Sequence, residues 1–132
     1  MISETDIQIG DWLHFEYTNP IDGFVSFNFK VSQLRRDYGD ELLVWGEKTP
    51  DGKHFGNIGI VSRIQPIPLT IEILEKNFPE PTDGITWYPE DGGFNCHTYI
   101  PKCEINAFGL FKYVHQLQHA LRLCEIKKEI II

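Results

Sequence analysis

The sequence lacks a concentrated basic patch and any long apolar run. Its 132 residues include 12 basic and 19 acidic side chains, for a net charge of −7. Nucleic-acid phosphates bind clustered Lys and Arg, and the pairs at 35–36 and 127–128 are too small for that purpose. No stretch approaches the roughly 20 apolar residues of a membrane helix. We therefore expect neither nucleic-acid nor membrane binding.

Cysteine is scarce, and a secretory leader is not apparent. The three cysteines are Cys96, Cys103 and Cys124, and an odd number argues against a disulfide framework. Residues 1–6 are acidic, where a signal peptide would be basic and then apolar. These features predict a cytoplasmic location.

Glycine-rich phosphate loops are missing as well. The glycines between residues 39 and 59 form neither a P-loop nor a dinucleotide-binding fingerprint. They are typical of turns and bulges, so the sequence predicts no nucleotide cofactor. No other cofactor is indicated by a motif.

What is present suits one folded domain. The chain is 42% hydrophobic and 13% aromatic, which is too rich in core-forming residues for a disordered segment. Its length lies within the usual range for one domain. The sequence therefore predicts a single domain over residues 1–132.

The first half has the two-residue period of β-strands. Val25, Phe27, Phe29 and Val31 fall on one face, with the polar residues between them on the other. Further strands are predicted at 7–17 with a kink at Gly10, at 42–45 and at 55–64. A charged turn is predicted at 35–40, and a hairpin loop at Thr49–Lys53. Short strands at such spacing favour an antiparallel meander or a small barrel.

The second half mixes helix and strand. Thr70 is a suitable N-cap for a short helix over 71–76. A hairpin is predicted from 85–88 and 94–100 around a turn at 90–93. Apolar residues at 110, 113, 114, 117, 121 and 124 predict a helix over 109–124, with Gln116, Gln118 and Arg122 off its stripe. The last residues, 126–132, either add a strand or dock on the core.

The fold class that follows is α+β. We expect an N-terminal antiparallel meander or small barrel, a short helix, a hairpin, and a C-terminal amphipathic helix packed on the sheet. The predicted core includes Trp12, Phe27, Phe29, Val44, Ile60, Leu74, Leu117 and Leu121.

Three short sequence motifs carry a resemblance to other proteins. They are Ile9-Gly10-Asp11-Trp12, then Ile67-Pro68-Leu69-Thr70 leading into Ile73-Leu74, and finally Tyr113-Val114-His115-Gln116-Leu117-Gln118. As a set they resemble a group of small proteins from Bacteroidetes chromosomes, mobile elements and phages. No activity is assigned to that group, so the resemblance transfers no catalytic residue. It implies an accessory gene product.

Two histidines and the cysteines are the candidate chemical groups. His115 and His119 are four residues apart on the predicted helix and so share a face, as metal-binding histidine pairs do. The position after the first His holds Gln116, which cannot act as a general base. Cys96 and His97 are neighbours on a strand and point to opposite faces, so this His cannot easily activate this Cys. No metal site is predicted. The alternative to a chemical role is a structural one, with the imidazoles half-buried and the thiol buried and unreactive.

An acidic, aromatic hairpin is the candidate binding surface. Trp87 and Tyr88 lie between Glu80 and Asp83 on one side and Glu90 and Asp91 on the other. Exposed aromatic side chains rimmed by charge are typical of protein interfaces. A solvated hairpin, or the paired carboxylates of a glycosidase, are the other interpretations of this segment.

The leading hypothesis is a non-enzymatic module that binds another protein through Trp87, Tyr88, Glu90 and Asp91. The alternative is a small hydrolase or metal-dependent enzyme that uses His115 and His119 with Cys96 or His97. A third hypothesis is acidic mimicry of nucleic acid, which requires carboxylates spaced like phosphates.

Overall fold

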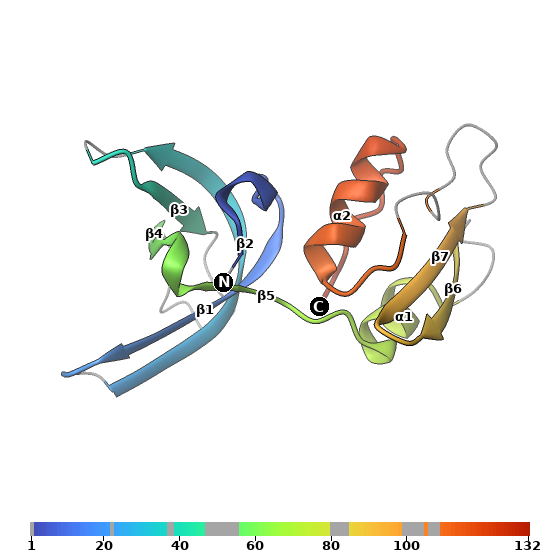
Figure 1. The fold of residues 1–132 in the computed structure, drawn as a ribbon, viewed down its shortest axis with the longest axis horizontal. Coiled ribbons are helices and arrows are strands. Elements are labelled where there is room, and N and C mark those ends of the chain that lie inside the picture. Colours follow the sequence, from blue (N-terminus) through green and yellow to red (C-terminus); the bar gives the residue numbers. More distant parts are fainter. Residues whose placement is uncertain are drawn as a thin grey trace. The chain divides into compact units, whose positions relative to one another are not determined.

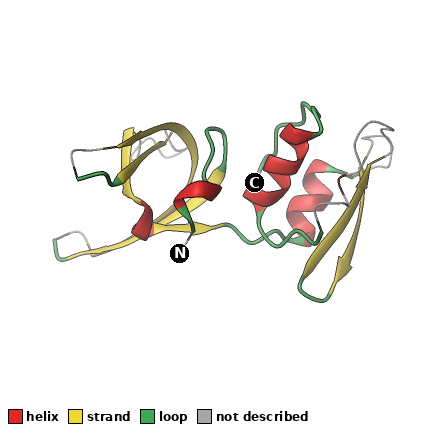
Figure 2. Cartoon of the chain, turned by 45° about the horizontal axis from the view of Figure 1, so that its top comes forward, coloured by secondary structure: helices red, strands yellow, loops and turns green. Residues whose placement is uncertain are grey.

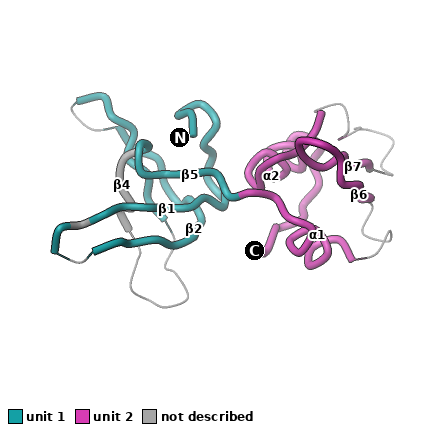
Figure 3. Tube along the Cα trace, turned by 60° about the horizontal axis from the view of Figure 1, so that its bottom comes forward, with its two compact units in different colours: residues 1–67 teal, residues 68–132 magenta. Residues whose placement is uncertain are grey.

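The computed structural model describes residues 2–21, 23–36, 39–46, 56–79, 85–98, 105 and 109–132. The chain divides into two compact units, residues 1–67 (unit 1) and 68–132 (unit 2), which are coloured separately in Figure 3. Both contain strands and helices, so the α+β class is confirmed (Figure 2). The hairpin loop predicted at Thr49–Lys53 lies outside the described residues. That residues 1–132 form a single domain stays a prediction.

Unit 1 is an antiparallel sheet with two one-turn 3-10 helices. Its elements are η1 (Glu4–Asp6), β1 (Trp12–Asn19), β2 (Gly23–Arg36), β3 (Leu42–Gly46), β4 (Gly56–Ile60), η2 (Val61–Arg63) and β5 (Ile64–Pro66). The sheet order is β4-β3-β2-β1-β5. β2 bends along its 14 residues, pairing first with β1 and then with β3 (Figure 1). The described strands form an open sheet, so the meander is confirmed and the closed barrel is not formed.

Strand alternation builds the core of unit 1. Leu13 lies opposite Phe29, and Phe15 lies opposite Phe27. Leu13, Phe15 and Phe29 are buried, while Phe27 is partly buried against the same cluster. Val44 is fully buried, as predicted. Facing side chains of neighbouring strands therefore meet on one side of the sheet.

The prediction that Trp12 belongs to this core is wrong. Trp12 pairs with Lys30 on the outer face and is only half-buried. The aromatic run at 12–17 contains large residues in both alternating sets, and a shift of one residue moves a strand's side chains to the other face. The core face is the one that carries Leu13 and Phe15. The side chain of Ile60, another predicted core residue, lies outside the described set.

The first of these three motifs, residues 9–12, forms a turn that leads into β1. Gly10 has a φ of 94°, which favours glycine. The Gly10 N–H donates to the Val31 carbonyl over 2.8 Å, and the buried Asp11 carboxylate accepts from the Gln8 N–H over 2.8 Å. Residues 7–9, which were predicted as strand, therefore lead into a turn, and β1 begins at Trp12.

Two other boundaries in unit 1 differ from prediction. The strand expected at 55–64 is split by η2, because β4 pairs with β3 while β5 pairs with β1 at the opposite edge. Residues 35 and 36, expected in a charged turn, extend β2 opposite Leu43 and Leu42. Cross-strand pairing overrides the local preference of charged residues for turns.

Unit 2 contains α1 (Ile71–Asn77), β6 (Ile85–Glu90), β7 (Gly93–Thr98) and α2 (Val114–Leu123). The Thr70 hydroxyl caps α1 by accepting from the Ile73 N–H over 3.2 Å, as predicted. α1 ends before Pro79, and Leu74 is buried. The expected C-terminal helix is present. None of the helices in the described parts of the chain has the length and apolar character that a membrane crossing requires.

α2 begins later than the predicted residue 109. Phe111 instead forms an extended bridge with Phe94, with two N–H to carbonyl bonds of 2.9 Å. The Gln116 side chain then accepts from the N–H groups of Lys112 (2.9 Å) and Tyr113 (3.1 Å), which starts the helix. Leu117 and Leu121 are buried as predicted, but so is Gln118, which was expected off the apolar stripe.

The C-terminal segment docks on α1, which is the second of the two predicted alternatives. The Asn77 amide donates to the Ile131 carbonyl over 2.7 Å and accepts from the Ile131 N–H over 2.8 Å. Asn77 also donates to the Ile73 carbonyl over 2.8 Å, and the amide is almost completely buried. Ile130 is buried beside this clamp. The Asn77 side-chain amide therefore makes the hydrogen bonds to the Ile131 backbone that a neighbouring strand would otherwise make.

Candidate functional site

The register of the β6–β7 hairpin decides which candidate residues face solvent. Trp87 lies opposite Cys96, Tyr88 opposite Asn95, and Thr86 opposite His97. Directly opposed residues share a face of a two-stranded sheet. Trp87 and Cys96 therefore belong to one face, and Tyr88 and His97 to the other.

The inner face of the hairpin is anchored. Ile85 and Cys96 are buried. Trp87 is half-buried, its indole N–H donates to the Phe78 carbonyl over 3.4 Å, and its ring meets Phe94 edge-on at 6.3 Å. A hydrogen-bonded indole with an aromatic neighbour is typical of a packed position. Trp87 therefore holds the hairpin in place.

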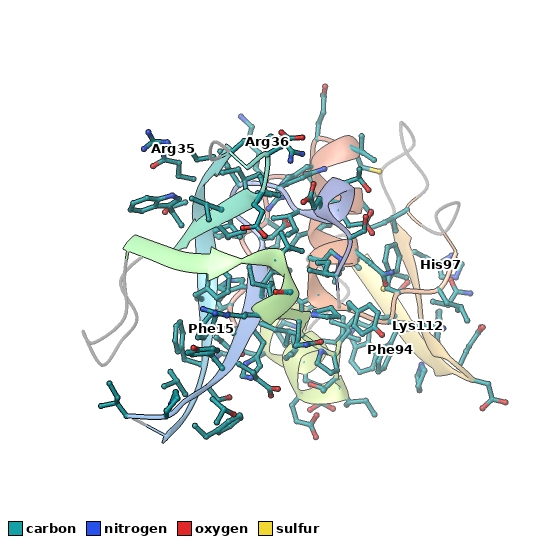
Figure 4. The ribbon with its side chains drawn as sticks, turned by 60° about the vertical axis from the view of Figure 1, so that its left-hand side comes forward. Phe15, Arg35, Arg36, Phe94, His97 and Lys112 are labelled. Carbon is teal, nitrogen blue, oxygen red and sulfur yellow. The ribbon has the colours of Figure 1, made fainter. Side chains whose placement is uncertain are left out.

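The outer hairpin face consists of Tyr88, Glu90, Asp91, Asn95 and His97. Tyr88 is 54% exposed. The centroids of its ring and the His97 imidazole are 5.8 Å apart, with an angle of 69° between the ring planes. The Glu90 carboxylate accepts from the Asn95 amide over 3.3 Å. His97 and Phe94, both labelled in Figure 4, extend from opposite faces of β7. The face combines an accessible aromatic ring, an imidazole and two carboxylates.

The turn of the hairpin is held against the segment that precedes α2. Gly92 has a φ of 87°. A Cβ atom on Gly93 would lie 2.7 Å from the Phe111 carbonyl oxygen, closer than such atoms approach. Only glycine therefore permits the Phe94–Phe111 bridge at this spacing. The bridge positions the outer hairpin face on a fixed support.

The predicted aromatic pair is divided by the fold. Trp87 faces inward and Tyr88 outward, so only Tyr88 is available to a partner as a largely exposed ring. Glu90 and Asp91 are exposed beside it. Glu80 and Asp83, the other half of the predicted acidic run, lie outside the described residues.

His115 and His119 do meet on one face of α2. Their ring centroids are 5.5 Å apart with the rings nearly perpendicular, and His115 stacks on Tyr113 at 6.0 Å. His115 is buried, whereas His119 is half-buried. No group of three or more His, Cys, Asp and Glu suited to a metal ion occurs in the part of the chain that the structure describes.

The cysteines have different states. Cys96 is a free, buried thiol, and burial raises its pKa to about 12. At neutral pH it is protonated and a poor nucleophile. Cys124 is disulfide-bonded, which the odd number of cysteines did not predict. Cys103 lies outside the described residues.

A polar chain on the outer face of β1 and β2 was not found by sequence reasoning. His14 Nδ1 lies 2.7 Å from Asn28 Oδ1, and His14 Nε2 lies 2.8 Å from Ser26 Oγ and 3.2 Å from Glu16 Oε1. An amide oxygen only accepts, so the imidazole donates to Asn28 in the tautomer that carries its proton on Nδ1. The alternation at 25–31 placed Ser26 and Asn28 on this face. Only the strand register brings His14 between them.

No protein-family model, curated protein or solved structure matches the chain. Function is therefore indicated by geometry alone, at the outer hairpin face, the His115–His119 pair and the His14 chain.

Proposed function

We propose that the protein is a non-enzymatic interaction module that binds another protein through its outer hairpin face. The observation that supports this function is Tyr88, which is 54% exposed on a hairpin whose other face is anchored by buried Ile85 and Cys96. An exposed aromatic ring on a rigid support loses little entropy when a partner covers it. Tyr is also among the residues that contribute most to binding energy at interfaces.

Charge indicates the kind of partner. Glu90 and Asp91 border Tyr88, and residues 72–92 contain six acids and one base. Complementary charge speeds association and selects against partners of the same sign. The partner is therefore a protein with an apolar pocket rimmed by Lys or Arg. The resemblance to phage and mobile-element proteins supports a partner that is encoded by the same element or by its host.

A matched set of variants tests this proposal. Tagged full-length chain is used to capture proteins from host lysate, and the purified partner is then titrated by calorimetry. Tyr88→Ala is expected to weaken binding at least tenfold, and Glu90→Gln with Asp91→Asn to reduce its dependence on salt. Phe24→Ala is the control, because Phe24 is 66% exposed in unit 1 and lies outside the hairpin. Equal binding by Tyr88→Ala and the unmodified chain would refute the proposal.

A hydrolase is the second candidate, and the His14 chain is the observation that favours it. The sequence indicated His115 and His119 with Cys96 or His97, but the Cys96 thiol is protonated at neutral pH and His97 lies on the other face of β7. In the His14 chain, Ser26 Oγ would bond to an acyl carbon and pass its proton to Nε2, which then protonates the leaving group. Water would release the acyl group from Ser26.

Reaction with a fluorophosphonate probe separates the two candidates. Hydrolysis requires covalent labelling of Ser26 that is lost in His14→Ala and reduced in Asn28→Ala. Ser26 and Asn28 are exposed on an open sheet face, where water competes with any substrate. For this reason protein binding is the proposed function. Absence of labelling at Ser26 removes the hydrolase.

A further inference from the structure

The outer face of β1 brings one imidazole and one carboxylate together. His14 and Glu16 are two residues apart on this strand, so their side chains leave the same face. His14 Nε2 lies 3.2 Å from Glu16 Oε1, and the two side chains are 25% and 48% exposed. The pair is therefore partly shielded by its neighbours and still open to small solutes.

The other nitrogen of this imidazole has its own hydrogen-bond partner. His14 Nδ1 lies 2.7 Å from the Oδ1 atom of Asn28, the residue directly opposite on β2. In the neutral ring the proton is on Nδ1, so the lone pair is on Nε2, the nitrogen beside Glu16. Histidines that bind metals have the same arrangement, because a hydrogen bond from the second ring nitrogen sets the tautomer and the orientation of the ring. Asn28 therefore holds His14 in the form that a metal ion requires.

The distance between the two donor atoms matches that between two ligands of one metal ion. Zn²⁺ binds imidazole nitrogen at about 2.0–2.1 Å and carboxylate oxygen at about 2.0–2.2 Å. With an angle of about 90–110° at the metal, these bond lengths place the two donor atoms about 2.8–3.5 Å apart. The observed 3.2 Å between His14 Nε2 and Glu16 Oε1 lies within this range. In the neutral ring both atoms are acceptors, so a cation between them replaces an unfavourable contact with two bonds.

The mixture of nitrogen and oxygen donors selects the kind of ion. Imidazole suits Zn²⁺, Cu²⁺ and Ni²⁺, whereas Mg²⁺ and Ca²⁺ prefer oxygen donors throughout. The Ser26 hydroxyl lies 2.8 Å from His14 Nε2 and competes for the same lone pair, so the ion displaces one neutral hydrogen bond. Two ligands from the chain leave coordination positions for water or for a bound molecule.

We propose that His14 Nε2 and Glu16 Oε1 together bind a divalent transition-metal ion of the Zn²⁺ and Cu²⁺ class, with Asn28 as the residue that positions the imidazole. The remaining ligands of the ion are water. The proposal is independent of the proposed function, because all three residues belong to unit 1. It excludes simultaneous use of the His14 chain as a hydrolase, since one lone pair cannot hold a metal and accept the Ser26 proton at the same time.

The test titrates the full ¹⁵N-labelled chain with ZnCl₂ in a buffer that does not bind metals. Long-range ¹H–¹⁵N spectra report the two ring nitrogens of each histidine separately. The expected result is a saturable shift of His14 Nε2, while MgCl₂ at the same concentrations leaves the ring unchanged. Saturation at His115 and His119 with His14 unmoved would assign the ion to α2 and overturn the proposal. The same response to Mg²⁺ and Zn²⁺, or no saturable shift at any histidine, would also overturn it.

Variants separate a metal site from general attraction of cations to an acidic chain. Glu16→Gln is expected to weaken Zn²⁺ binding at His14 at least about tenfold, because it replaces the ligating carboxylate with a neutral amide. Asn28→Ala removes no ligand and is expected to weaken binding about tenfold by releasing the imidazole. Glu75→Gln makes the same change in charge at an exposed position of α1 and is expected to have no effect. Equal effects of Glu16→Gln and Glu75→Gln would overturn the proposal.

Discussion

The two units bury their cores by different means. In unit 1, alternating residues of long paired strands meet on one face, as Leu13 and Phe29 do. In unit 2, side chains hold backbone in place: Thr70 and Gln116 start the helices, and Asn77 clamps the C-terminal segment. The first arrangement follows from a repeating pattern of apolar residues. The second depends on single residues that no neighbour can replace.

The largest effect is expected for a core residue of unit 1. Leu13→Ala should lower the free energy of unfolding by about 3 kcal/mol, because Leu13 is fully buried. Trp12→Ala, one residue away on the outer face, should lower it by about 1 kcal/mol. Urea unfolding followed by fluorescence and circular dichroism measures both. A larger loss for Trp12→Ala would mean that β1 is shifted by one residue.

Gly93→Ala tests the support of the hairpin in unit 2. A Cβ atom 2.7 Å from the Phe111 oxygen must separate the Phe94–Phe111 bridge, so a loss of about 3 kcal/mol is expected. Gly23→Ala is the control, because Gly23 has a φ of 78° but no atom within 4 Å of its Cβ position. That change should cost about 1 kcal/mol. Similar losses at both positions would show that backbone conformation alone matters.

Asn77→Ala should remove the clamp on the C-terminal segment. Three short hydrogen bonds are lost at a buried position, and about 2 kcal/mol of stability with them. The Ile131 amide should then exchange its hydrogen much faster, which mass spectrometry or NMR measures. Asn95→Ala, which removes a single exposed bond of 3.3 Å, should leave exchange unchanged. Continued protection of Ile131 in Asn77→Ala would contradict the clamp.

The buried thiol makes unit 2 sensitive to alkaline pH. The pKa of Cys96 is about 12 in the folded chain against 9.0 for an unburied thiol. Between these values the unfolded chain loses a proton that the folded chain keeps, so stability falls as pH rises, by up to about 1.4 kcal/mol per pH unit. Below pH 9 the contribution is constant. Cys96→Ala should flatten this part of the stability curve, whatever its effect at neutral pH.

The smallest effect on stability is expected at Tyr88. Its ring touches His97 but is more than half exposed, so Tyr88→Ala should lower stability by about 0.5 kcal/mol. Trp87→Ala should lower it by about 2 kcal/mol, because Trp87 packs on Phe94. Thermal unfolding of both variants measures the difference. A large loss for Tyr88→Ala would mean that its role is structural.

The sequence correctly predicted the features that depend on residues close together in the chain. The alternation in β2, the Thr70 cap, the β6–β7 hairpin and the buried stripe of α2 all depend on residues a few positions apart. The face of Trp12, the start of α2 and the burial of Gln118 depend on which distant segment lies alongside. The clamp by Asn77 is of the same kind, because nothing near residue 77 indicates a partner at residue 131.

The candidate site shows the same division. Sequence predicted a hairpin with exposed acidic and aromatic side chains, and it predicted that Cys96 and His97 point apart. It did not separate Trp87 from Tyr88, because their faces depend on which side of the hairpin packs inward. It also missed the His14 chain, since His14 and Ser26 are 12 residues apart and meet only through strand register.

The Asn77 clamp also sets an order of events during synthesis. Asn77 must wait for a residue that emerges 54 positions later. At the usual 5–20 residues per second, α1 spends roughly 3–11 s without the partner that satisfies its buried amide. Unit 1 has all of its strands by residue 67. A nascent chain therefore contains the complete sheet of unit 1 while the C-terminal segment that packs on α1 is still to be made. Chaperones would meet the two halves of the chain in different states of folding.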